Sequence, residues 1–206
     1  MIEKIGPTIY KGESIYNNGA GGGGGGIGLK EIGGITYPFV KINNLYWFIA
    51  NLKWRDNNIP ISGGDYNNTP HVWYYDINDI YYKYSLRGFL YNNYAVEYII
   101  NNIDFGDGWR IPTHDDCLDL GTVSNKLKSR EWDGSNELLF NGIPSGARYP
   151  SATPRFQDID TEFLMYNQKK TGSVFELFEL KTGVNTAYLF NGIDNGAYSI
   201  RLCKDV

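Results

Sequence analysis

The chain has 206 residues, of which 42% are hydrophobic and 20% charged, a composition that allows a buried core and argues against global disorder. A net charge of -4 without a basic stripe argues against a nucleic-acid partner, and two cysteines are too few for a disulfide framework or a zinc site. The sequence opens without an apolar signal region, and no apolar run is long enough to span a bilayer, so we expect neither a signal peptide nor a transmembrane segment.

A glycine-rich leader precedes the patterned part of the chain. Residues 1–18 are weakly patterned, and an unbroken glycine run covers residues 21–26. Polyglycine has much backbone entropy to lose, so its default state is a flexible linker; ordering against neighbouring subunits is the alternative. We expect residues 1–32 to be a linker or assembly element and residues 33–206 to form one domain.

Two strands open the expected domain. Residues 35–42 are typical of a strand, Asn43 and Asn44 of a turn, and residues 45–50 of a second strand. Apolar residues then recur at helical spacing within residues 92–102, which predicts a short helix.

The clearest helix start lies at Thr113. Thr113 can cap the helix, and Asp116 three residues later makes a near capping box. Leu120, Val123 and Leu127 would supply the apolar face, so we expect this helix to continue to the basic residues near 130.

The chain then returns to strands, predicted at residues 173–180, 186–190 and 198–203. In the last of these, Tyr198 and Ile200 alternate with Ser199 and Arg201, which predicts opposite faces. Strands, two short helices and then strands predict an α+β fold.

Candidate chemistry is sparse in this sequence. His71 and His114 lie far apart, and we interpret His114 as a surface residue in the first turn of a helix. Cys117 is interpreted as a buried thiol rather than a nucleophile. We expect no catalytic residues, no metal and no cofactor, and therefore a protein that is not an enzyme.

Several stretches in a fixed order resemble the Fibrobacter succinogenes major paralogous domain, abbreviated FISUMP. They are Gly34-Ile35-Thr36-Tyr37, Gly88-Phe89-Leu90-Tyr91-Asn92-Asn93, Gly106-Asp107-Gly108-Trp109-Arg110-Ile111-Pro112-Thr113, Ile143-Pro144-Ser145-Gly146-Ala147-Arg148 and Tyr198-Ser199-Ile200-Arg201-Leu202-Cys203. The resemblance covers residues 33–206 and implies a C-type-lectin-like fold with twisted antiparallel strands. Trp109 would be a core residue, and Gly108 would allow a close approach of the backbone before it.

The chain also departs from the family pattern. The family usually places Cys-Pro just before Gly-Trp, whereas residues 104–107 here contain no cysteine, so Cys203 lacks its usual partner. The catalytic cysteine pair of the related formylglycine-generating enzymes is missing, as are the sugar-binding motifs of true C-type lectins.

Domains of this family occur on bacterial surface proteins and on phage structural proteins. Because the sequence has no apolar signal region and no cysteine framework, and joins a glycine-rich leader to a lectin-like domain, we expect a non-enzymatic phage virion protein: a fibre, tail-tip or capsid-decorating adhesin that binds a glycan or protein of the host surface. Residues 1–32 would contact other virion proteins and sister subunits, and we expect a homo-oligomer, specifically a trimer. The alternative is a bacterial surface or pilus-associated binding protein. The expected exposed binding residues lie in Tyr- and Asn-rich C-terminal loops: Tyr166, Asn167, Asn185, Tyr188, Asn191, Asp194, Asn195 and Tyr198.

Overall fold

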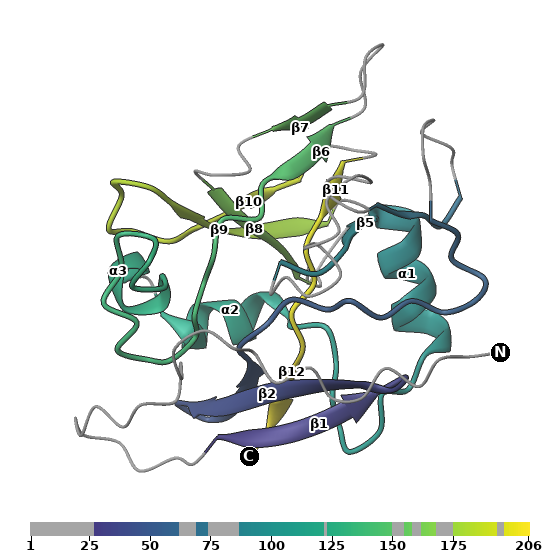
Figure 1. The fold of residues 1–206 in the computed structure, drawn as a ribbon, viewed down its shortest axis with the longest axis horizontal. Helices are drawn as coiled ribbons and strands as arrows, with labels where there is room; N and C mark the ends of the chain where they lie inside the picture. Colours follow the sequence, from purple (N-terminus) through teal and green to yellow (C-terminus); the bar gives the residue numbers. More distant parts are fainter. Residues whose placement is uncertain are drawn as a thin grey trace, which may run out of the picture.

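A computed structural model describes residues 27–61, 69–73, 87–121, 123–149, 155–157, 162–167, 175–192 and 196–206. The chain is α+β, with short helices set against antiparallel sheets (Figure 1). The strands are β1 (Gly28–Ile32), β2 (Ile35–Ile42), β3 (Leu45–Phe48), β4 (Val72–Trp73), β5 (Leu90–Asn92), β6 (Ala147–Tyr149), β7 (Arg155–Gln157), β8 (Glu162–Asn167), β9 (Glu176–Lys181), β10 (Tyr188–Asn191), β11 (Ala197–Tyr198) and β12 (Cys203–Asp205). The helices are α1 (Asn93–Asn102), α2 (His114–Leu120) and α3 (Ser124–Leu127).

The strands form three sheets. A four-stranded sheet has the order β1-β2-β3-β12, a three-stranded sheet the order β10-β9-β8, and a five-stranded sheet the order β4-β5-β11-β6-β7. In Figure 1 the four-stranded sheet lies at the bottom, α1 stands on the right, and α2 and α3 lie on the left below the three-stranded sheet. The C-terminal strand β12 therefore closes the sheet that begins with β1.

Two sheets each contribute to two separate core clusters. In the four-stranded sheet, Tyr37 and Phe48 point into one cluster, whereas Val40 and Trp47 point into the other. The three-stranded sheet divides in the same way, because alternate strand residues point to opposite faces. Both faces of these sheets are therefore covered over part of their area.

The first predicted elements are confirmed. β2 spans the predicted residues, the turn at Asn43 has a φ of 53°, and β3 follows. The predicted helix at residues 92–102 is α1, whose N-cap Asn92 accepts a hydrogen bond from the backbone N–H of Ala95 at 2.9 Å. Gly28–Ile32, placed in the expected leader, instead pair with β2 as strand β1, and Ile32 is buried.

The second predicted helix is wrong in its length. Thr113 caps α2, and the capping box with Asp116 is present, but the helix ends at Leu120 because Gly121 has a φ of 99°. A separate short helix, α3, follows. Leu120 and Leu127 are buried as expected, whereas Val123 is 49% exposed because it lies in the break between the helices.

The predicted last strand is also corrected. Residues 198–203 are divided between β11 and β12, and all six are buried. Ile200 packs in a core cluster, and Arg201 on the opposite side is fully buried in a polar network. Alternate residues of this segment therefore point to opposite sides that are both buried, one apolar and one polar.

Trp109 is a core residue, as predicted. The explanation expected for Gly108 is wrong, however. Apart from its chain neighbours, no described residue has a heavy atom within 4 Å of the position a Cβ would occupy there, and the residue has a φ of 76°. Gly108 is therefore required by its backbone conformation and not by a close approach.

Candidate functional site

The eight predicted binding residues differ in their exposure to solvent. Asn185, Tyr188 and Asn191 are exposed. Asp194 and Asn195 lie outside the described residues. The expected exposure is wrong for the remaining three, which are buried: Tyr166, Asn167 and Tyr198.

The buried tyrosines belong to the core. Tyr166 and Tyr198 pack edge to face, with ring centroids 5.2 Å apart, and the Tyr166 hydroxyl donates a hydrogen bond to the Gly196 carbonyl at 2.8 Å. The Asn167 side chain donates to the Glu176 carboxylate at 3.0 Å. Turn-like composition alone suggested exposure, but strand β8 carries Tyr166 and Asn167 into the interior.

The exposed residues gather on the edge strand β10. Burial alternates along this segment: Ala187 is buried and Leu189 packs against the core, whereas Thr186, Tyr188 and Phe190 are exposed. Tyr188 is 47% exposed and Phe190 39%. Residues two apart on a strand share a face, so these side chains form one row pointing to solvent.

Val123 extends this row. It forms an antiparallel bridge with Thr186, and the backbone N–H of Ser124 donates to the Asn185 carbonyl at 3.0 Å. Directly paired residues on antiparallel segments lie on the same face. We call Val123, Thr186, Tyr188 and Phe190 the β10 face.

The chemical character of the β10 face is apolar and uncharged. Residues 182–192 contain no Lys, Arg, Asp or Glu and no proline. Native edge strands usually carry such residues, because they prevent pairing with another chain. Half-buried Glu179 on β9 is the cross-strand partner of Tyr188 and places a carboxylate on the same face of the sheet. The arrangement offers aromatic surface, a phenol hydroxyl and strand backbone groups to a partner.

A polar row occupies the other side of the same sheet. Asn191, Glu176 and Asn167 are cross-strand partners, and His114 at the start of α2 contacts Glu176, with Nδ1 2.6 Å from Oε2. His114, predicted as a surface residue, is half-exposed and paired. The row joins α2 to the sheet that carries β10.

The two cysteines are buried and free. Burial raises the pKa of Cys117 and of Cys203, so both thiols remain protonated at neutral pH. The interpretation of Cys117 as a buried thiol is confirmed.

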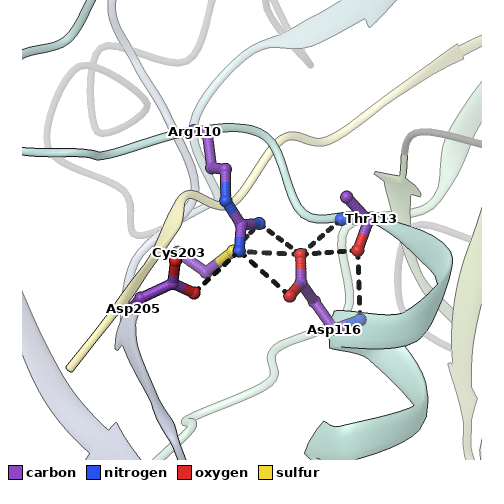
Figure 2. A network of polar contacts seen from close by, with 5 residues as sticks. All are labelled: Arg110, Thr113, Asp116, Cys203 and Asp205. Carbon is purple, nitrogen blue, oxygen red and sulfur yellow. Dashed lines mark hydrogen bonds and ion pairs between the residues drawn. The ribbon is translucent and has the colours of Figure 1, made fainter.

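Arg110 is the centre of a network that ties β12 to α2 (Figure 2). Its guanidinium forms an ion pair with Asp116 and donates to Asp205 at 3.1 Å and to the Cys203 sulfur at 3.2 Å. Asp116 also accepts from the Thr113 backbone N–H at 2.6 Å and from its hydroxyl at 2.8 Å. Burial alone would raise the pKa of Asp116, but the hydrogen bonds from Arg110 and Thr113 lower it on balance.

Asp116→Asn is expected to lower the free energy of unfolding by about 1–2 kcal/mol at pH 7, because it removes charge-assisted hydrogen bonds between buried Asp116 and partly exposed Arg110. The lowered pKa of Asp116 makes this stabilisation complete above the ordinary carboxyl pKa near 4, and it is lost as the pH falls through the lower folded-state pKa. Urea titrations from pH 7 to pH 2.5 should show that the difference in free energy of unfolding between the unaltered protein and Asp116→Asn becomes smaller below pH 4. The control Asp115→Asn should cost about 0.5 kcal/mol, and a gap that is independent of pH would contradict this assignment.

Sequence reasoning missed Val123, Thr186 and Phe190 as members of the exposed row. Alternation within residues 186–190 could have identified Thr186 and Phe190, since it groups them with Tyr188. No comparable signal existed for Val123, because its place depends on a bridge to Thr186, far away in the sequence.

No protein-family model, no curated protein and no solved structure matches this chain. Among the described residues, no group of three or more His, Cys, Asp or Glu side chains is placed to hold a metal ion. None of the helices in this part of the chain has the length and apolar character needed to cross a bilayer.

Proposed function

We propose that this chain is a non-enzymatic structural protein of a phage virion, and that the β10 face binds the host surface. In this proposal residues 28–206, with β1 as the first strand, form a C-type-lectin-like domain of the FISUMP type, used as a fibre, tail-tip or capsid-decorating adhesin. The residues before β1 attach it to other virion proteins and to sister subunits in a homotrimer. The observation that carries the binding role is the row of exposed apolar side chains on the uncharged edge strand β10.

The β10 face has the features of a binding surface. The rings of Tyr188 and Phe190 are partly exposed to water, although β10, which carries them, is held in the sheet by pairing with β9. Exposed aromatic residues on a rigid support contribute strongly to binding, because little conformational entropy is lost when they are covered. The antiparallel sheets and short helices are compatible with the fold implied by the resemblance.

Exchanging both aromatic residues tests the binding role. The double variant Tyr188→Ala/Phe190→Ala in the full chain is expected to weaken binding about 10- to 100-fold, the usual effect of removing central aromatic contacts. Binding is measured with labelled protein on a panel of whole bacteria and on a glycan array. Ile100→Ala on α1, at a side chain 38% exposed, is the matched control and should bind as the unaltered protein does.

The outcomes separate the possible roles. Equal binding by the double variant and the unaltered protein, on a surface that both recognise, would place the contact elsewhere. Mass spectrometry of purified particles checks the virion assignment. Detection in bacterial envelope or pilus fractions and not in particles would favour a bacterial surface protein.

A further inference from the structure

A fully buried ammonium group lies beneath the turn that leads into the β10 face. Lys128 directly follows α3, and only 1% of its side chain is exposed. Its Nζ forms an ion pair with Asp133 and donates to the backbone carbonyls of Lys181 at 3.3 Å and Val184 at 3.4 Å. The charge is therefore satisfied by oxygen atoms from two separate segments.

Two neighbours of Lys128 hold the same turn. The second carboxylate oxygen of Asp133 accepts from the backbone N–H of Gly183 at 2.8 Å, and Trp132 Nε1 donates to the Thr182 hydroxyl at 2.6 Å. The hydrogen bond from Lys128, followed by that from Gly183, lowers the pKa of Asp133. We call Lys128, Trp132 and Asp133 the Lys128 clamp.

The clamp contacts the β9–β10 turn at four successive residues. It binds the carbonyls of Lys181 and Val184, the N–H of Gly183 and the side chain of Thr182. A buried ammonium group keeps its partners close, because leaving a cation unpaired in the interior is costly. One residue, Asn185, separates this turn from Thr186, the first β10-face residue on the segment that leads into β10.

We propose that Lys128 is a positioning residue for the β10 face. By fixing the turn at residues 181–184, it fixes where the strand begins and how Thr186 and Tyr188 are presented. The inference rests on the proposed binding function of this face. If Lys128 has this role, a buried residue that does not touch the bound surface controls binding strength.

Lys128→Met in the full chain tests the inference, with Lys126→Met as the matched control. Lys126 lies on α3, two residues before Lys128; its side chain is about half exposed and pairs only with exposed Glu137 among the described residues. Lys128→Met should accelerate hydrogen exchange at the Gly183 and Val184 amides about tenfold or more, the effect of losing one charge-assisted hydrogen bond. It should also weaken surface binding by about tenfold, whereas Lys126→Met should change neither quantity.

A spectroscopic measurement separates positioning from general destabilisation. The NMR titration of Asp133 should show its pKa moving up toward the ordinary carboxyl value in Lys128→Met. Cooperative thermal unfolding should be retained, because methionine fills a similar buried volume without a charge. If Lys128→Met does not fold, Asp133→Asn provides the same exchange and binding measurements.

Unchanged exchange at Gly183 and Val184 in a folded variant would overturn the clamp itself. Faster exchange with unchanged binding would overturn the positioning role while leaving the β10 face as the binding site. If the unaltered protein binds no tested surface, the proposed function fails, and the exchange result still decides whether Lys128 holds the turn.

Discussion

Arg201→Met is expected to lower the free energy of unfolding by about 3 kcal/mol, because it leaves buried acceptors without donors. Arg201 is fully buried, and its guanidinium donates twice to the side-chain oxygen of Asn51, at 3.1 and 2.8 Å, and also to the Phe140 carbonyl. It also lies 4.3 Å from the centroid of the Phe140 ring. Burial lowers the pKa of Arg201 to about 9, so the group remains a cation at neutral pH.

The network around Arg201 joins distant parts of the chain. Asn51 donates to the Arg87 carbonyl at 2.9 Å and to the Ser199 hydroxyl at 3.2 Å, and Ser199 donates to Ser145 at 3.0 Å. Removing the guanidinium therefore disturbs a buried network rather than a single bond.

Urea denaturation followed by tryptophan fluorescence measures the effect of Arg201→Met. The control is Arg130→Met at an exposed arginine, which should change the free energy of unfolding by less than about 0.5 kcal/mol. A decrease in the free energy of unfolding of less than about 1 kcal/mol for Arg201→Met would show that the buried acceptors find other donors.

Gly88→Ala is expected to lower the free energy of unfolding by about 3–4 kcal/mol. Gly88 has a φ of 67°, and a Cβ there would lie 2.4 Å from the Leu52 carbonyl oxygen. That oxygen accepts hydrogen bonds from the Phe89 backbone N–H at 2.9 Å and from the Tyr91 hydroxyl at 3.1 Å. It therefore cannot move away without weakening both bonds, so steric overlap adds to the backbone strain.

Gly108→Ala separates the two contributions. Its φ of 76° is similar, but in the part of the chain that the structure describes, no heavy atom beyond its neighbours in sequence lies within 4 Å of the added Cβ. Backbone strain alone should cost about 1–2 kcal/mol. Thermal and urea unfolding of both variants give the comparison, and equal losses would show that the Leu52 carbonyl moves aside freely.

Local elements of the fold could be predicted because their signals lie within a few residues. Strand β2 follows from β-branched and aromatic residues before the Asn43 turn, and the caps of α1 and α2 follow from Asn92 and Thr113. The stop at Gly121 lay in the sequence too, but the apolar spacing of Leu120, Val123 and Leu127 suggested a continuous helix.

The candidate site could be predicted only in part. Asn185, Tyr188 and Asn191 are exposed as expected, but Tyr166 and Asn167 are buried. Composition indicates turns and possible contact residues, whereas exposure depends on which other strands cover them.

Patterns along the chain were sufficient to predict the α+β class, strands such as β2, the helix starts and a core that includes Trp109. The full burial of Arg201 and Lys128, and the place of Val123 beside Tyr188 on one face, became visible only in the folded chain. The alternation of apolar and polar residues along a strand predicts which side chains share a face. Whether that face is buried depends on an element from a distant part of the chain. Buried cations in particular depend on carbonyls and carboxylates that the folded chain brings together.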